Sequence, residues 1–169
     1  MQVTARADYA LRAMVELAAQ GDGAEDRNAN RGIDRNAERH ETIRGAYVSE
    51  AQGIPKKFLE NILFDLKRAG LVRTQRGAGG GYQLARAPEE ITLADVIRAV
   101  EGPLANVRGE WPEDLSYAGA ASPLKKVWIA LRANLRAVLE SVTLADVVHD
   151  KLPEAVQELT RSSAAWQHH

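Results

Sequence analysis

Basic side chains gather between residues 55 and 86, and they are the feature of this sequence best suited to chemistry with a partner. The stretch holds seven lysines and arginines against two acidic residues, a net charge of +5, whereas the rest of the chain carries −6. Lysine and arginine on one face bind phosphates and release counterions. A local basic block in a chain with a net charge of −1 is therefore typical of a nucleic-acid-binding face.

The first part of this block predicts a helix with a basic start. Pro55 suits the first helical position, and Lys56 and Lys57 follow it, where both their charge and the helix dipole favour phosphate. One turn further on, Glu60 could accept from cytosine and Asn61 could pair with adenine. Taken alone, the same pattern also fits an ordinary solvated helix face.

The second part predicts a β-hairpin with a basic tip rich in glycine. The strand-like pieces LVRTQ and GYQLA flank the tip, with Arg73 and Arg76 beside Gly79 and Gly80. A narrow tip carrying arginine suits a minor groove. Glycine-rich loops also cradle nucleotide phosphates, but RGAGGGY fits neither GxxxxGK[ST] nor a GxGxxG motif that opens a helix.

Other chemistries find little support in the residue types present. The chain has no cysteine, which excludes disulfides, thiolate nucleophiles and cysteine-ligated zinc or iron-sulfur centres. The four histidines lack the spacing of a helix-borne metal site, so we assign no metal and no cofactor. No catalytic motif appears, and the paired acids at 89–90 and 113–114 lie in expected loops, so we expect no enzyme.

The length of the apolar runs indicates where in the cell the chain is expected. They are only a few residues long, far short of the roughly 20 residues that cross a bilayer. The N-terminus has no hydrophobic signal core. We therefore expect a cytoplasmic protein without a membrane partner.

The elements that must position the basic block follow from apolar periodicity. A helix is predicted over Thr4–Ala19, with Thr4 as its N-cap, followed by a mobile loop over Gly21–His40. A helix over about residues 43–51 ends at Gly53, and the basic helix ends at Gly70. Two helices joined by a turn and followed by a hairpin make a winged helix-turn-helix.

The second half is predicted to be helical apart from one long loop. Thr92 and Asp95 form a capping-box pattern at the start of a helix that ends near residues 101–103. After a loop over 104–123, an apolar stripe predicts a long helix from Leu124 to Val142, and a capped final helix follows over 143–148. The fold class is therefore mainly α with a small β-hairpin wing. The expected units are a DNA-binding domain at 1–90 with a flexible insertion at 21–40, a dimerisation and sensing region at 91–152, and a frayed tail at 153–169.

The segment at residues 53–102, GIPKKFLENILFDLKRAGLVRTQRGAGGGYQLARAPEEITLADVIRAVEG, resembles the Rrf-two family of bacterial winged-helix regulators, the group of IscR, NsrR and CymR. The opening TARADYALRAMVELA and the later VWIALRANLRAVLESVTLADVV are similar to other parts of that family, so the resemblance covers most of the chain. The glycine-rich wing joined to the ITLADVIRAVEG helix is its specific signal.

The resemblance implies a homodimer that binds a partly palindromic double-stranded DNA operator, with wings in minor grooves and long helices crossing at the dimer interface. Lys57, Phe58, Glu60 and Asn61 match the base-facing segment, and Arg76 matches the minor-groove arginine. The full set of expected DNA-binding residues is Lys56, Lys57, Phe58, Glu60, Asn61, Arg73, Arg76, Gly79, Gly80 and Tyr82. The expected dimer interface consists of Leu124, Val127, Trp128, Leu131, Leu135 and Val138.

The sequence departs from this family where its sensors hold metal. Those members place three cysteines in the loop before the long helix, whereas this loop reads VRGEWPEDLSYAGAASPLKKVW. Asp8 matches a carboxylate ligand of some relatives, but without sulfur partners we interpret it as a solvated or helix-capping residue. Trp111, Tyr117 and Trp128 could line a small-molecule pocket. Alternatively, Trp128 belongs to the dimer core and Trp111 packs the loop.

The sequence therefore predicts a homodimeric transcription regulator without an iron-sulfur cluster, expected to act as a repressor. A small-molecule or protein effector is one way in which it could be controlled. The alternative is a protein-interaction module that keeps the winged-helix fold but has lost DNA binding.

Overall fold

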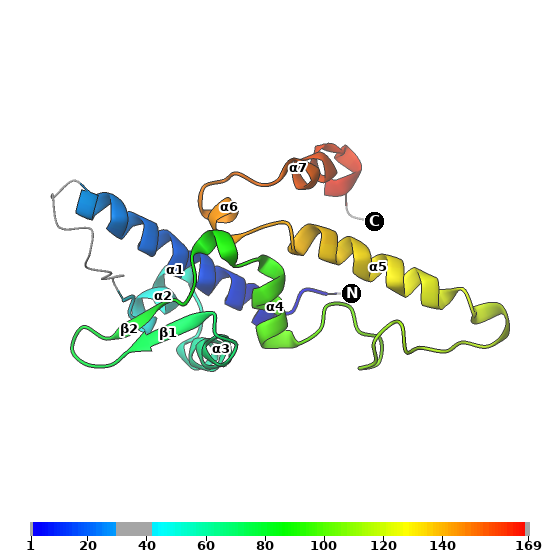
Figure 1. The fold of residues 1–169 in the computed structure, drawn as a ribbon, viewed down its shortest axis with the longest axis horizontal. Helices are drawn as coiled ribbons and strands as arrows, with labels where there is room; N and C mark the ends of the chain where they lie inside the picture. Colours follow the sequence, from blue (N-terminus) through cyan, green and yellow to red (C-terminus); the bar gives the residue numbers. More distant parts are fainter. Residues whose placement is uncertain (1, 30–41, 168–169) are drawn as a thin grey trace.

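The computed structural model describes residues 2–29 and 42–167 and is shown in Figure 1. The α-helices, in chain order, are α1 (Ala5–Ala29), α2 (Gly45–Gln52), α3 (Lys56–Arg68), α4 (Leu93–Glu101), α5 (Leu124–Leu139), α6 (Leu144–Val148) and α7 (Glu154–Arg161). The strands β1 (Val72–Gln75) and β2 (Gly81–Leu84) pair antiparallel, and three short 3-10 turns are η1 (Pro88–Glu90), η2 (Gly119–Ala121) and η3 (Ser163–Trp166). The predicted fold class, mainly α with one β-hairpin, is confirmed. Among the described helices, none has the length and apolarity needed to span a bilayer.

Helix α1 is longer than the sequence predicts. Thr4 caps it as expected, since its hydroxyl accepts the backbone N–H of Ala7 at 3.0 Å. The helix then runs past Ala19 to Ala29, so the predicted loop is wrong for residues 21–29. Adding residues to an existing helix avoids the cost of nucleation, which allows it to continue through glycine. The remainder of the predicted loop lies outside the described residues.

Helices α2 and α3 form the predicted helix-turn-helix. α2 ends at Gly53, whose φ of 62° is the left-handed conformation that glycine adopts without a Cβ penalty. Ile54 then enters the core, and Pro55 is the N-cap of α3 rather than its first helical residue. A second left-handed glycine, Gly70 with φ 72°, turns the chain from α3 into the hairpin.

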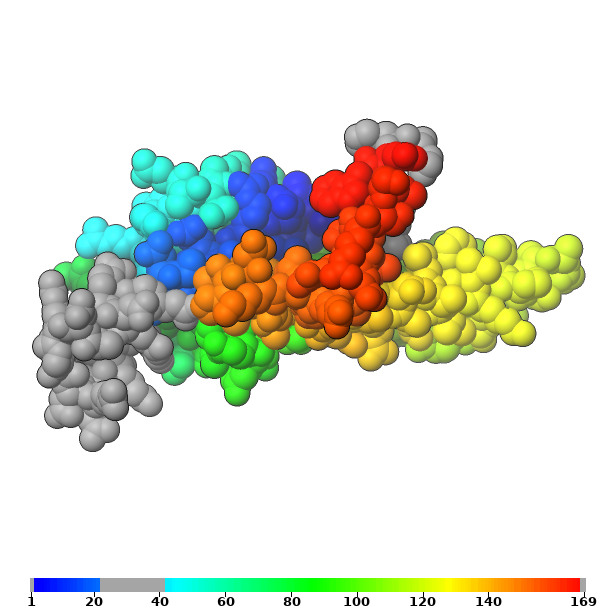
Figure 2. All heavy atoms as spheres, turned by 90° about the horizontal axis from the view of Figure 1, so that it is seen from above, coloured from blue at the N-terminus to red at the C-terminus, as the bar shows by residue number. Residues whose placement is uncertain are grey.

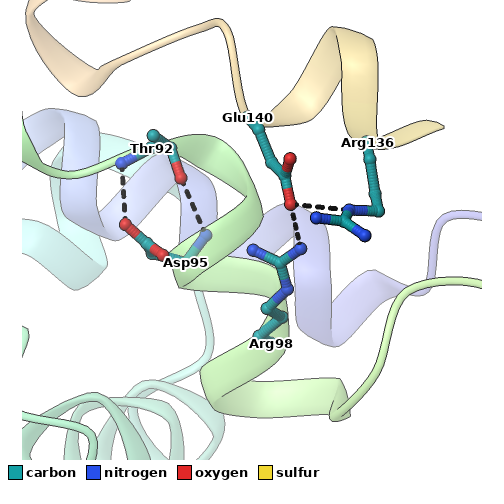
Figure 3. A network of polar contacts seen from close by, with 5 residues as sticks. All are labelled: Thr92, Asp95, Arg98, Arg136 and Glu140. Atoms are coloured by element: carbon teal, nitrogen blue, oxygen red, sulfur yellow. Dashed lines mark hydrogen bonds and ion pairs between the residues drawn. The ribbon is translucent and has the colours of Figure 1, made fainter. Parts of the chain in front are cut away.

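The N-termini of α4 and α6 are joined side by side. Each begins with a capping box, formed by Thr92 with Asp95 in α4 and by Thr143 with Asp146 in α6; Figure 3 shows the first. The backbone N–H of Leu93 donates to the carbonyl of Val142 at 2.9 Å. Both capping boxes predicted from the sequence are confirmed, and the backbone pairing fixes α6 beside α4.

One hydrophobic core runs through the molecule. It combines residues of α1, α2, α3 and β1 with residues that come after position 90, and its members include Ala10, Met14, Leu17, Val48, Ile54, Leu59, Ile62, Leu63, Leu66, Leu71, Val72, Ile91, Val96 and Leu144. The predicted boundary at residue 90 therefore passes through a shared core. The separate roles assigned to the two sides of that boundary stay a prediction.

The loop at 104–123 and α5 project from the body as an arm (Figures 1 and 2). Within this loop, Leu104, Pro112 and Leu115 are buried, so the segment is not wholly solvated. Helix α5 begins at Leu124 as predicted but ends at Leu139. Val142, which the sequence analysis placed on the same helical stripe, is instead buried in the connection to α6.

The C-terminal segment contradicts the prediction of a frayed tail. Helix α7 follows Pro153, which fixes a helix-compatible φ at the N-cap, and η3 follows α7. The first turn of α7 carries Glu154 and its last turn carries Arg161, an order that complements the helix dipole. Helix α6 is confirmed, but it is not the final helix.

Candidate nucleic-acid interface

Helix α3 divides into an apolar face and a polar face. Its buried residues are Leu59, Ile62, Leu63 and Leu66. The α3 residues predicted to contact DNA are all exposed, namely Lys56, Lys57, Phe58, Glu60 and Asn61. The division follows from the spacing of three and four residues between apolar positions, which places them on one side of a helix of 3.6 residues per turn.

The polar residues at the start of α3 have unused hydrogen-bonding groups. Lys56, Lys57, Glu60 and Asn61 make no side-chain hydrogen bond or ion pair with any other described residue. Pro55, the N-cap, supplies no side-chain bond to the first turn. Two cations at a helix start with free backbone N–H groups favour a bound phosphate.

Phe58 contacts α1 while keeping much of its ring accessible. Its ring centroid lies 6.3 Å from that of Tyr9, with the planes at 72°, and the Arg12 guanidinium stands 5.5 Å above the Tyr9 ring. Edge-to-face and cation-π contacts of this kind hold the aromatic side chains in place. Phe58 is nevertheless 54% exposed, so it can also contact a partner.

The two predicted wing arginines lie in different environments. Arg76, at the tip, is exposed and makes no hydrogen bond or ion pair within the described chain. Arg73, on β1, donates from Nη2 to the carbonyl of Ala85 at 3.2 Å, so its guanidinium lies along the base of the hairpin. Arg76 is therefore the better placed of the two to enter a groove.

Close backbone approach explains one glycine at the tip, and a positive φ explains another. A Cβ on Gly80 would lie 2.5 Å from the carbonyl oxygen of Gln75, which no side chain tolerates. Gly77 has φ 106°, a region open mainly to glycine. Gly79, in contrast, is exposed, and a Cβ there would meet open space. The close approach of the backbone at the tip therefore requires a glycine at position 80. Glycine at position 79 adds no side chain to the exposed tip.

Tyr82 lies at the junction between the wing and α2 and not at the tip. Its backbone exchanges two hydrogen bonds of 2.8 Å with Ile43, and its half-buried ring packs close to Gly45 and against the core. The sequence analysis placed Ile43 inside the second helix, but that helix begins only at Gly45. Ile43 instead forms an isolated antiparallel β-bridge with Tyr82 of β2.

Two residues beside the wing tip were missed by the sequence analysis. Thr42 and Arg44 flank Ile43, and their side chains reach carbonyl oxygens of the tip. Arg44 is exposed and adds a positive charge close to the wing. The signal available was a β-branched pair, Thr42 and Ile43, ahead of a helix start, but it lies outside the basic block and directly after a segment without periodicity.

The end of α5 is tied to α4 by a network of charged groups, drawn in Figure 3. Glu140 pairs with Arg98 of α4, and its Oε1 also accepts from Nε of Arg136 at 2.9 Å. The hydrogen bonds from Arg98 and then Arg136 lower the pKa of the Glu140 carboxyl below its ordinary value, because they stabilise its charged form. This network connects the arm with the body.

Helix α5 presents its apolar stripe to solvent. Of the predicted interface residues, Leu124 and Val127 are exposed, and Trp128, Leu131, Leu135 and Val138 are half-buried. Within the described chain, no residue of α5 is buried. An amphipathic helix of 16 residues with this much uncovered apolar surface is suited to packing against another helix.

Two of the three aromatic residues considered as pocket walls are joined by a hydrogen bond. Trp128 donates from its indole N–H to the hydroxyl of Tyr117 at 2.9 Å, whereas Trp111 remains 48% exposed. A shallow hollow of about 260 Å³ lies elsewhere, between the end of α3 and α4, where Arg86, Asp95 and Arg98 line part of it. The hollow does not include the three aromatic residues that the sequence analysis considered as pocket walls.

Asp8 and the other carboxylates do not assemble into a metal site in the part of the chain that the structure describes. Asp8 pairs with Arg12 one turn along α1, at 3.2 Å, as expected for a solvated residue in a first helical turn. Across residues 2–29 and 42–167, no group of three or more His, Cys, Asp or Glu side chains is arranged to hold a metal ion.

Residues 34–150 match the model of the Rrf2 family, described as "Iron-dependent Transcriptional regulator". The match covers more than half of the chain. The residues present do not fit the iron of that description, because the chain has no cysteine and the described carboxylates do not converge. No step of the proposed function is therefore routed through iron.

Individual relatives agree with the family match. Rv1287 of Mycobacterium tuberculosis, whose name describes an HTH-type transcriptional regulator, is 44% identical over 159 residues that cover 94% of this chain and 88% of the relative. The HTH-type transcriptional regulator CymR of Bacillus subtilis is 32% identical, with 87% and 89% covered. The solved structure of CymR from B. subtilis has a TM-score of 0.66 at 27% identity, with 88% of this chain and 97% of that chain covered. The structure of IscR from T. potens has a TM-score of 0.65 at 30% identity, with 92% and 90% covered. With its helix-turn-helix, wing and long helix α5, the chain belongs to the Rrf2 family of helix-turn-helix transcriptional regulators and is not an enzyme.

Proposed function

We propose that this regulator acts as a homodimer on a two-fold symmetric DNA operator, without an iron-sulfur cluster, and that it represses transcription. Each protomer inserts the start of α3 into a major groove and its wing tip into the neighbouring minor groove. Because it acts on DNA, the proposed location is the cytoplasm.

One observation carries the DNA-binding surface. The side chains of Lys56, Lys57 and Asn61 on α3, and of Arg76 on the wing, are exposed and have no polar partner in the described chain. Not every cation of the chain is free in this way, since Arg6, Arg98 and Arg132 are paired with carboxylates. Unpaired cations on a surface are suited to phosphate, which dominates the affinity of proteins for DNA.

The homodimer rests on α5. Its uncovered stripe includes Leu131 and Leu135, which are spaced as in a helix-helix seam. Two-fold pairing of α5 would relate two winged helix-turn-helix units, which we call the reading heads, by one symmetry axis. Two such units require two half-sites on one face of the duplex. Control by a small-molecule or protein effector is compatible with this architecture, because a ligand that changes the spacing of the heads would change operator affinity.

Selection of bound duplexes from a random pool, followed by affinity measurements at several salt concentrations, tests this function. We expect a two-fold symmetric sequence whose affinity falls steeply as salt rises. The matched control is a duplex with one half-site scrambled, which should bind far more weakly if two heads bind together. A transcription assay with the selected operator placed at a promoter then tests repression.

Two other outcomes would reject parts of the proposal. If no sequence is enriched and binding stays weak at low salt, the winged-helix surface serves another partner, and the protein-interaction module becomes the better interpretation. If a single half-site is enriched and the second half-site adds no affinity, the chain binds DNA but not as a symmetric dimer.

A further inference from the structure

A residue far from the wing in the sequence pairs with its outer edge, because Ile43 forms an isolated antiparallel β-bridge with Tyr82 of β2. Ile43 donates its backbone N–H to the carbonyl of Tyr82 and accepts the N–H of Tyr82, both at 2.8 Å. The two backbone segments approach so closely here that a Cβ on Gly81 would lie 2.5 Å from the carbonyl oxygen of Ile43. Ile43 is therefore fixed to the edge of β2, and the next residue, Arg44, is the N-cap of α2.

Both neighbours of Ile43 bind the wing tip through their side chains. The Thr42 hydroxyl donates to the carbonyl oxygen of Gly79 at 2.5 Å. Nη2 of Arg44 donates to the carbonyl oxygen of Ala78 at 3.3 Å. We call residues 42–44 the strap, because they connect the N-terminus of α2 with the tip of the wing.

The tip has little else to hold it. Strand pairing ends at Gln75 and Gly81, and within the tip the backbone bond is that from Gly80 N–H to the carbonyl of Gly77, at 2.9 Å. Three of the four residues between Arg76 and Gly81 are glycines, which lose more conformational freedom on ordering than any other residue. A tip that is ordered before it meets a partner avoids that cost on binding.

We propose that Thr42 and Arg44 are positioning residues, which hold the wing tip in the geometry that delivers Arg76 to DNA. This inference rests on the proposed function and deepens it, because it assigns part of the DNA-binding geometry to side chains outside the helix-turn-helix and the hairpin. The strap acts through the tip, so its effect depends on Arg76.

The first test is Thr42→Val, which keeps the shape of the side chain and removes its donor. We expect operator affinity to fall roughly threefold to tenfold, as for loss of one hydrogen bond. Thr42→Ser should restore affinity because it restores the hydroxyl. The matched control is Thr74→Val, the same change at an exposed threonine on β1 that makes no side-chain hydrogen bond with the described residues. Arg44→Gln should weaken binding as Thr42→Val does.

A double-mutant cycle separates positioning from general destabilisation. If Thr42 acts through the tip arginine, Thr42→Val should cost much less in a chain that already carries Arg76→Ala. In the free protein, amide exchange at Gly79 and Gly80 should be faster in Thr42→Val than in Thr74→Val.

The outcomes distinguish this inference from the proposed function. Two outcomes would overturn the positioning role alone, provided that the wild-type protein binds its operator tightly. In the first, Thr42→Val binds as tightly as the wild type. In the second, the binding free energies lost in Thr42→Val and in Arg76→Ala add fully in the double variant. Failure of the wild-type chain to bind any duplex would overturn the proposed function and the positioning role together.

Discussion

At the scale of single residues, the exposed face of α3 combines two kinds of contact. Lys57 is a flexible cation beside a helix start, suited to phosphate of any sequence, whereas Asn61 offers the paired donor and acceptor that match adenine. Neither side chain has a partner in the described chain, so neither is committed to holding the fold together. Substitutions at the two positions should therefore have different signatures.

Asn61→Ala should change sequence preference, while Lys57→Gln should weaken binding to all sequences. For Asn61→Ala we expect a loss of about 1–3 kcal/mol at one operator position, with relaxed discrimination there. For Lys57→Gln we expect a salt slope lower by about one and an unchanged base preference. Affinities for an operator and its single-base variants at several salt concentrations check both. Equal losses on every sequence for Asn61→Ala would remove Asn61 from base reading.

Arg76→Ala should weaken operator binding by about 1–3 kcal/mol if the arginine enters a minor groove. Its matched control is Arg161→Ala, which removes an exposed arginine from α7, far along the chain from the wing. Binding isotherms at one fixed salt concentration compare the two variants. Should Arg76→Ala bind like the wild type, the wing tip does not contact the operator.

Exposure of the candidate DNA-binding residues could be predicted from the sequence where residue chemistry and local pattern coincide, whereas their contact with DNA stays a prediction. The lysines of α3 and the tip arginine belong to a basic block. The lysines follow Pro55, and the arginine precedes the glycines of the tip, so their exposure could be predicted. Thr42 and Arg44 could not be placed in this way, because their contacts are with a hairpin more than 30 residues later. Tyr82 was included among the expected DNA-binding residues, but its half-buried ring packs against the core.

At the scale of elements, the sequence succeeded where an element carries its own end signals. Left-handed glycines and capping boxes fixed the ends of α2, α3, α4 and α6. The prediction failed at α1, because residues 20–29 have no apolar periodicity and are helical as an extension of a packed helix. It failed again at α7, where the acidic first turn and basic last turn were the available signals but few apolar residues repeat.

The junction between α4 and α5 predicts a pH dependence of stability. The folded-state pKa of Glu140 lies below its unfolded value, so the pair with Arg98 and Arg136 stabilises the fold above the unfolded pKa of a glutamate. That contribution is lost as pH falls through the folded-state pKa. Thermal unfolding between pH 7 and pH 3 should therefore show a smaller acid-side decrease in Tm for Glu140→Gln than for the wild type.

The control for this prediction is Glu158→Gln, which neutralises an exposed glutamate of α7 outside the network. It should leave the acid-side decrease unchanged. Because Glu140 is partly solvated, the difference will be modest and should shrink further at high salt. If the acid-side decrease in Tm is as large in Glu140→Gln as in the wild type, the ion pairs of Glu140 do not stabilise the junction.

At the scale of the whole molecule, one core makes the reading head a rigid unit. α1 packs against α3, α4 and α6, so the helix-turn-helix cannot move independently of the capping-box pair behind it. The arm is tied to α4 by the ion pair between Arg98 and Glu140, the residue that ends α5. If two protomers pair along α5, the distance between the two reading heads is set by this junction, which fits a fixed spacing between half-sites.

The proposed dimer can be tested by placing a charge on either side of α5. Leu135→Asp puts a carboxylate on the apolar stripe, where pairing would bury it without a partner, so we expect monomers at micromolar concentration. Ala133→Asp introduces the same charge at an exposed position on the opposite side of the helix and should leave the dimer intact. Sedimentation or light scattering gives the mass, and circular dichroism establishes that both variants remain folded.

Because Leu135 is only half-buried in the protomer, the fold should survive the change, and the monomer should bind a single half-site with reduced affinity for the full operator. A Leu135→Asp protein that stays dimeric would place the interface away from α5, and the spacing of half-sites would then have to be set by another surface.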